Sequence, residues 1–244
     1  MIVKQSSRGW LMIYQAAHGL LAGKIANRLK KKLRPKYWLE TITAILEHDD
    51  HQLRFDEKLY LNEIGLPIDF VKEETADDKV LERAKRIYKK ARIKSKYTAL
   101  LVSLHLDFLY GEMNDAGMKD FLQCLKSNRD EIEKLYGLQE KEVNEIYQIL
   151  RFCDRCSLIL CKNQLPAMGR SLEINTSILG ETYYISKNDE NKINVEPWPF
   201  EENQFELSIE QMLVESAEFK DNAALKKALA NSKTELLQWV FQKN

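Results

Sequence analysis

The stretch "AILEHDDHQL", residues 44–53, places two histidines and two aspartates together at the end of an apolar run. The chain has only four histidines in all, so two of them within four residues is a marked concentration. Imidazole nitrogens and carboxylate oxygens bind divalent cations and exchange protons near neutral pH. His48 and Asp49, with their neighbours Asp50 and His51, are therefore the first candidates for chemistry.

Further candidates follow from the helix faces on which ionisable residues fall. Apolar residues recur with a helical period over residues 15–32, 36–52, 78–113 and 140–162, which predicts a helix in each range. Each of these four helices carries ionisable side chains on or beside the apolar face that points inward. In chain order they are His18, His48 with Asp49, His105, and Asp154. Burying an uncompensated carboxylate costs several kcal/mol, so something inside the fold must neutralise these groups.

A shared divalent cation would neutralise these groups together. Mixed imidazole and carboxylate ligands suit Fe, Mn, Zn or Mg, and the sequence does not choose among them. Alternatively, each group is satisfied separately, with inward histidines hydrogen-bonded in the core and Asp154 paired with Arg151 or Arg155. We favour the metal, because four independent burials would otherwise have to coincide. The predicted ligands are His18, His48, Asp49, His105 and Asp154.

The elements around this site predict a mainly α protein (α+β) with a small antiparallel sheet. Residues 1–14 form an N-terminal β hairpin, and residues 15–165 form a helical, metal-binding domain. Residues 166–244 form a small β-rich subdomain packed on the bundle, because alternating and β-branched runs are separated there by Asn, Gly, Asp and Pro. A short helix near residues 223–230 and a last strand at 235–242 complete it, and the hairpin could join the same sheet.

Composition limits the partners. Lys plus Arg and Asp plus Glu number 37 each, so no field of one sign attracts nucleic acid or an anionic membrane. No apolar run approaches the roughly 18 residues of a membrane span. Four cysteines are few for the length, and Gln15 and His18 interrupt the apolar segment 10–23, which argues against a secretory signal. We expect a cytoplasmic protein that acts on a small molecule and that could form an oligomer.

The order of these residues resembles the HD superfamily of metal-dependent phosphohydrolases. Its members have a His on one helix, a His-Asp doublet ending another and an Asp on a late helix. Here His18, His48–Asp49 and Asp154 match those positions, and His105 stands where many members carry an additional His for a second metal. The resemblance covers about residues 10–165 and implies an HD-like helical bundle there.

The longer layout is similar to an uncharacterised group, domain-of-unknown-function family 3891, which combines such a bundle with small β elements. The matching features are "MIV", "YQAAHGLLAG", "HDD", "LVSLH", "FCDRCSL" and "PWPF". One departure from the HD pattern concerns phosphate handling. Many HD phosphohydrolases place a Gly and a Lys just after the doublet, whereas this chain has Asp50, His51 and Gln52. Arg54 or Arg155 would then have to supply the positive charge that contacts the phosphate.

These features predict a metal-dependent hydrolase acting on a phosphoester. A bound cation lowers the pKa of water from about 15.7 towards roughly 7 and polarises a phosphoryl oxygen. Asp49 or His105 would exchange protons with the reactants, so both are candidate catalytic residues. Gln15, Asp50 and His51 are expected beside the ligands or the substrate. The alternatives are a di-iron oxygenase on a similar scaffold and a non-catalytic interaction protein with a structural or vestigial metal site.

Overall fold

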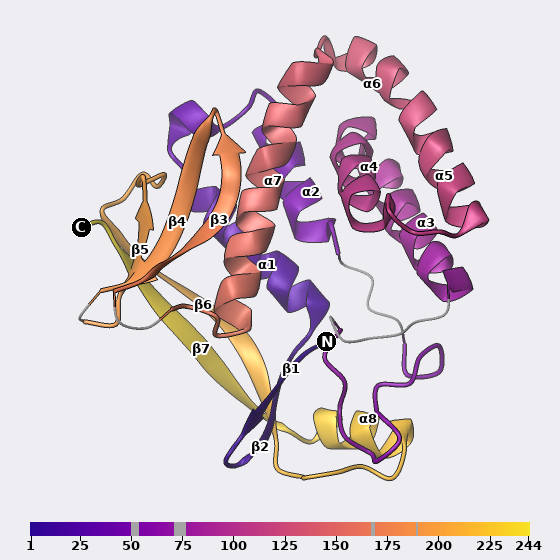
Figure 1. Cartoon of the computed structure of the whole chain (residues 1–244), viewed down its shortest axis with the longest axis vertical. Coiled ribbons are helices and arrows are strands. Elements are labelled where there is room, and N and C mark those ends of the chain that lie inside the picture. Colours follow the sequence, from indigo (N-terminus) through magenta and orange to yellow (C-terminus); the bar gives the residue numbers. More distant parts are fainter. Residues whose placement is uncertain (50–53, 71–76, 167–168, 189) are drawn as a thin grey trace.

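The protein folds into one curled sheet with helices packed mainly against one of its faces, as Figure 1 shows for this computed structural model. The structure describes residues 1–49, 54–70, 77–166, 169–188 and 190–244. Its seven strands are β1 (Ile2–Ser6), β2 (Gly9–Ile13), β3 (Ser171–Ile178), β4 (Glu181–Lys187), β5 (Ile193–Glu196), β6 (Gln204–Val214) and β7 (Lys233–Gln242).

The sheet joins the two ends of the chain. Its strand order is β1-β2-β6-β7-β5-β4-β3. The N-terminal hairpin pairs with β6, where Trp10 lies opposite Val214. Neighbouring strands are antiparallel except β5 and β7, which pair in parallel through Ile193 and Phe241. The sheet is therefore mixed, and it curls into a half-barrel around the innermost helices (Figure 1).

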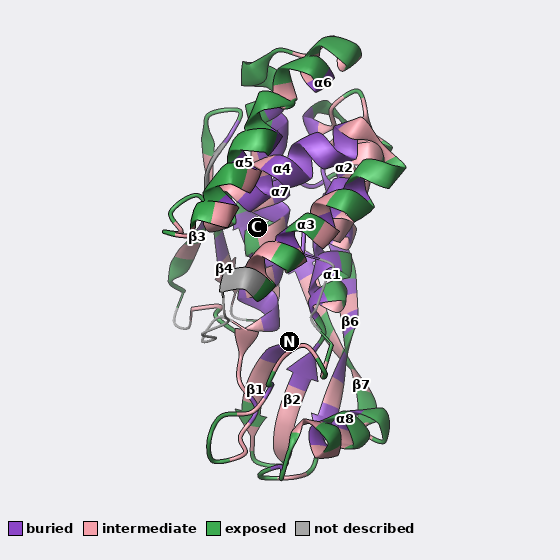
Figure 2. Cartoon of the chain, turned by 90° about the vertical axis from the view of Figure 1, so that its right-hand side faces the viewer, coloured by how far each residue is buried: buried purple, intermediate pink, exposed green. Residues whose placement is uncertain are grey.

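The helices form layers over this sheet. Helices α1 and α7 lie on it, against β6 and β3, and α2 and α4 pack on them in turn. Figure 2 shows α4 and α7 largely buried, whereas α5 and α6 are mostly exposed. The helices are α1 (Gln15–Arg28), α2 (Trp38–Glu47), α3 (Asp77–Lys94), α4 (Lys96–Tyr110), α5 (Ala116–Ser127), α6 (Arg129–Tyr136), α7 (Glu140–Cys161) and α8 (Asn222–Ala230), with a short 3₁₀ turn η1 (Lys31–Leu33). Within the described residues, none of them combines the length and apolarity needed to cross a membrane.

One hydrophobic core runs through both the sheet and the helices. Ile185, Val195 and Phe241 of the sheet are fully buried in the same cluster as Ile25 of α1 and Phe152 of α7. Burial of such side chains contributes about 1.5–3 kcal/mol each, before the loss of chain entropy is counted. The sheet is thus a main layer of the fold and supports the helices that carry the candidate site.

The predicted fold class is wrong. We expected a mainly α, HD-like helical bundle with a small antiparallel β subdomain, whereas the chain is about half helix and a quarter strand, with a seven-stranded mixed sheet. The local sequence pattern indicates the strands one at a time. It does not indicate that β2 pairs with β6, which is far from it in the sequence, or that β5 pairs with β7 in parallel. Those long-range pairings make one large layer out of short segments.

The helical pattern at residues 78–113 forms two helices instead of one. Ser95 has an extended backbone, and its Oγ accepts a hydrogen bond from the backbone N–H of Thr98. Serine favours such a capping position because its hydroxyl satisfies an N–H that lacks a partner in the helix. The break lets α3 pack along α4. This arrangement brings Arg83 of α3 to the cavity described below.

Candidate metal centre

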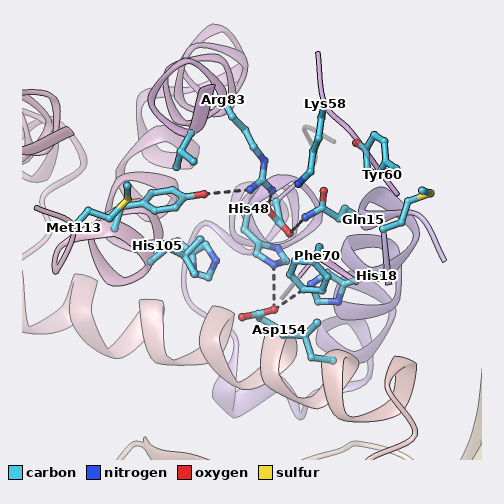
Figure 3. A pocket seen from close by; sticks show the side chains of 16 residues that line it. Gln15, His18, His48, Lys58, Tyr60, Phe70, Arg83, His105, Met113 and Asp154 are labelled. Carbon is cyan, nitrogen blue, oxygen red and sulfur yellow. Dashed lines mark hydrogen bonds and ion pairs between the residues drawn. The ribbon is translucent and has the colours of Figure 1, made fainter. Parts of the chain in front are cut away.

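Three of the predicted ligands meet between α1, α2 and α7. His18 lies on α1, His48 directly follows α2, and Asp154 lies on α7. The possible ligand atoms of the three residues all lie within 4.8 Å of one another. Asp154 Oδ1 is 3.1 Å from His18 Nε2 and 3.2 Å from His48 Nε2. Dashed lines mark both contacts in Figure 3. The two imidazoles are almost completely buried, and the Asp154 side chain is 14% exposed.

Two glycines allow α1 and α2 to approach closely enough for this contact. A Cβ on Gly19 would lie 2.5 Å from the carbonyl oxygen of Leu46, and one on Gly23 would lie 2.5 Å from Leu46 Cδ2. At Gly19 the obstacle is backbone, so a larger side chain would require the helices to move apart, whereas at Gly23 the side chain of Leu46 would have to move. His18 precedes Gly19 and His48 comes two residues after Leu46, so the imidazole centroids lie only 5.2 Å apart.

Hydrogen bonds fix the orientation of both imidazoles. His48 Nδ1 donates to the carbonyl oxygen of Ile45 at 2.7 Å, and a carbonyl can only accept. Ser157 Oγ donates to the Asp154 carbonyl at 2.8 Å, so it accepts from His18 Nδ1 at 2.7 Å. Each Nδ1 therefore carries a proton. In the neutral imidazoles, both Nε2 atoms present a lone pair to the Asp154 carboxylate.

Three electron-pair donors facing one another at about 3 Å repel unless a cation stands among them. Burial opposes a positive charge on His48, but Asp154, and after it Asp49, raise the pKa of His48 above its ordinary value. Burial likewise raises the pKa of the Asp154 carboxyl, yet His48 and His18 hold it well below its usual range. The carboxylate is thus ionised, and a proton or a metal ion compensates it. Two oriented imidazole nitrogens and one carboxylate oxygen fit a divalent metal ion.

The three residues line a cavity of about 630 Å³. This volume is typical of pockets that bind small molecules. Part of its wall is apolar and comes from Val80 of α3, Leu109 of α4 and Met113, which follows α4. A metal ion held by three protein ligands keeps coordination positions for water or substrate, as catalytic metal sites do. The cavity provides the space in which such a ligand could bind.

Asp49 lies beside this group without joining it. Its Oδ2 accepts a hydrogen bond from Gln15 Nε2 at 3.0 Å, and its Oδ1 forms an ion pair with Arg83. The backbone of His48 keeps a helical conformation just after α2. A helical step of one residue turns the side-chain direction by about 100°, so Asp49 does not point the same way as His48. Asp49 and Gln15 both line the cavity. They are positioned to contact a bound ligand.

His105 also lines the cavity but lies outside the three-residue group. Its ring centroid is 4.8 Å from that of His48, and its Nδ1 is hydrogen-bonded to the Tyr147 hydroxyl at 3.3 Å. Burial, and then the neighbouring His48, lower the pKa of His105 to about 3. His105 is therefore neutral at physiological pH and offers the cavity an uncharged polar group.

The remaining predicted site residues that the structure describes do not join this group. Asp50 and His51 lie outside the described residues. Arg54 is exposed and forms ion pairs with Asp56 and Glu57. Arg155 is exposed as well, and neither arginine is among the described residues that line the cavity. The structure therefore does not place either of them where a phosphate at the metal group could reach it.

Sequence reasoning missed two basic residues of the cavity wall, Arg83 and Lys58. Arg83 belongs to a helix with many basic residues, so its charge alone did not distinguish it from solvent-exposed neighbours. One signal could have found it: Arg83 comes three residues after Val80 and four before Ile87, so it shares the inward stripe of α3. Lys58 had no comparable signal, because it lies in an irregular segment where no periodicity indicates a face.

The fold and site together define a protein with a curled mixed sheet, layered helices and a cavity that contains a possible His₂Asp metal group. The family described as "Protein of unknown function (DUF3891)" matches residues 1–216, and the chain belongs to that family. All three possible ligands lie within the matched region. The predicted similarity to this family is confirmed, whereas the comparisons do not connect the chain with the HD superfamily. No curated protein and no solved structure matches the chain.

Proposed function

We propose that this protein is a metal-dependent hydrolase acting on a small phosphoester, with the metal ion held by His18, His48 and Asp154. The observation that carries the proposal is the convergence of two imidazole Nε2 atoms on one carboxylate oxygen. Their lone pairs are directed inward because Ile45 and Ser157 hold the opposite ring nitrogens. The order of these three ligands along the chain also resembles the HD phosphohydrolase pattern.

A divalent cation in this position would lower the pKa of a coordinated water and would polarise a phosphoryl oxygen. Asp49 is the proton acceptor that we assign, because Gln15 and Arg83 hold its carboxylate at the cavity wall. His105, hydrogen-bonded to Tyr147, has a pKa lowered to about 3, so it would stay neutral and offer a bound ligand a hydrogen bond instead of accepting a proton. Both groups line the cavity.

The main alternative is an oxygenase, because two histidines and one carboxylate also bind iron(II) in non-haem oxygenases. A di-iron centre would need ligands for a second ion. The described residues contain one group of three possible ligands, which favours a single metal ion. Hydrolysis is the simpler proposal, since it needs only the cation, water and proton acceptors. Metal identity and oxygen consumption would separate the two classes.

The decisive measurement is the metal content of protein purified without added metal and without a histidine affinity tag. We expect about one equivalent of a transition metal in the wild type, and loss of it in His48→Ala and in Asp154→Ala with secondary structure intact. His105→Gln is the matched control, because it alters a buried cavity histidine outside the three-residue group. It should retain the metal.

Turnover then separates a catalytic metal from a structural one. Metal-loaded wild type should hydrolyse at least one member of a broad phosphoester panel, and Asp154→Ala should not. Retention of metal by both ligand variants, or no metal binding by the wild type even after reconstitution, would refute the site. Bound metal with no turnover on any phosphoester would refute the hydrolase and favour a structural metal in an interaction protein.

A further inference from the structure

Two basic side chains form the wall of the cavity that faces the metal group. Figure 3 shows Arg83 and Lys58 extending into the cavity from the side opposite Asp154. Arg83 comes from α3, and Lys58 from the segment at residues 54–70. The two heads are close enough that Arg83, after burial, contributes to lowering the pKa of Lys58 to about 8.

Contacts within the fold hold the Arg83 side chain and the segment that carries Lys58. The guanidinium of Arg83 donates to the Tyr110 hydroxyl at 3.2 Å and pairs with Asp49. The segment that carries Lys58 is attached to α8. There, Asn222 accepts a hydrogen bond from the backbone of Tyr60 at 2.9 Å and donates to that of Phe55 at 2.8 Å. A binding site gains affinity when its groups are held in place before the ligand arrives.

The charges of the cavity lining call for an anion. Of the acidic and basic side chains that line it in the described structure, Asp49 and Asp154 are negative and Arg83 and Lys58 are positive. They balance, so a divalent metal ion leaves an excess of two positive charges. Arg83 already pairs with Asp49, and Lys58 brings a second basic side chain to the same wall. An anionic ligand placed between the two side chains would be attracted by both of them.

We infer that Arg83 and Lys58 bind a tetrahedral dianion, the phosphate group of a phosphomonoester, between themselves and the metal ion. This inference rests on the proposed function, because the metal supplies the third contact. A guanidinium offers a planar fork of N–H donors to phosphate oxygens, and an ammonium adds a point charge. Val80, Leu109 and Met113 form an apolar wall for the organic part of the ester.

The test is calorimetric titration of inorganic phosphate into metal-loaded protein. Lys58→Met keeps most of the apolar stem and removes the charge, and it should weaken phosphate binding about tenfold to a hundredfold. Arg83→Lys keeps the charge but removes the fork, and it should weaken binding at least severalfold. The control is Lys85→Met on the exposed side of α3, where Lys85 pairs with Glu82. It should change the affinity by less than about twofold.

Metal content measured on the same samples separates this inference from the hydrolase proposal. Full metal content with unchanged phosphate affinity in both Lys58→Met and Arg83→Lys overturns the anion site and leaves the metal site standing. A wild type without metal refutes the proposed function instead. Malonate, a dianion whose charge is divided between two planar carboxylates, serves as the competitor. Tighter binding of malonate than of phosphate would overturn the assignment to a tetrahedral phosphoryl group.

Discussion

Substitution of Gly19 by alanine tests whether helix packing sets the geometry of the metal centre. The added Cβ would lie 2.5 Å from the backbone oxygen of Leu46, and real Cβ atoms essentially never approach another atom closer than 3.0 Å. Because the obstacle is backbone, α2 has to move away from α1 by at least the difference, 0.5 Å. His48 moves with α2, whereas His18 stays on α1.

The expected effects on stability and on metal affinity differ in size. Overpacking costs about 1–3 kcal/mol, and replacing glycine by alanine inside a helix returns about 1 kcal/mol. The net loss in the free energy of unfolding is therefore about 0–2 kcal/mol, which leaves the protein folded. Metal–ligand distances tolerate only about 0.2 Å, so the displacement of His48 exceeds what the site accommodates. We expect Gly19→Ala to lower metal affinity by at least about tenfold.

Competition with a chelator measures the metal affinity, and chemical denaturation of metal-free protein measures the stability. Gly117→Ala provides the matched control, because its new Cβ would meet two side-chain atoms and no backbone: Leu81 Cδ2, the end of a flexible side chain, at 2.9 Å, and Asp115 Oδ1 at 3.4 Å. That variant should keep the wild-type metal affinity and lose no stability. If Gly19→Ala binds metal within about twofold of the wild type, the close approach at Leu46 does not control the site, and the argument from packing is wrong.

Three further predictions concern the groups that support the site. Ser157→Ala should weaken metal binding about tenfold to a hundredfold in chelator competition, because His18 loses the partner that holds its Nδ1. Asn222→Ala should weaken phosphate binding in calorimetry without changing metal content, because it releases the segment that carries Lys58. Sulfate, which stays a dianion throughout, should bind more weakly as pH rises above about 8, where Lys58 loses its charge beside Arg83 and the Met1 amino group. The slope should be at most about tenfold per pH unit, and Lys58→Met should lack this added dependence.

The sequence predicted the local elements and the inward direction of several ionisable residues, because both follow from periodicity. The pattern over residues 140–162 corresponds to α7, and it placed Asp154 on the stripe that faces the interior. The same reasoning placed His18 inward on the first helix, and the structure brings these two residues together. Periodicity is informative here because a buried helix face repeats every three to four residues, whichever partner covers it.

Two features lay beyond this reasoning because they depend on contacts between distant segments. The pairing of Trp10 with Val214 decides that the strands form one sheet, and no local pattern encodes it. The role of Asp49 depends on Arg83, which comes from a different helix. Because His48 and Asp49 are adjacent in the sequence, we predicted that they bind the same metal ion. In the structure, the side chain of Asp49 is directed to Arg83 instead. A sequence neighbour is a poor guide to a shared contact when the backbone is helical.

The layered construction predicts that metal binding and substrate binding can be altered separately. His18 and Asp154 stand on helices that lie directly on the sheet, and His48 is held by the tight contact between α1 and α2. Arg83 and Lys58 belong to the outer helix α3 and to an irregular segment, where fewer side chains are buried. Changes in the outer layer leave the inner contacts in place, so they should alter anion affinity at constant metal content. Changes at the α1–α2 contact displace His48, a proposed metal ligand, and should impair both.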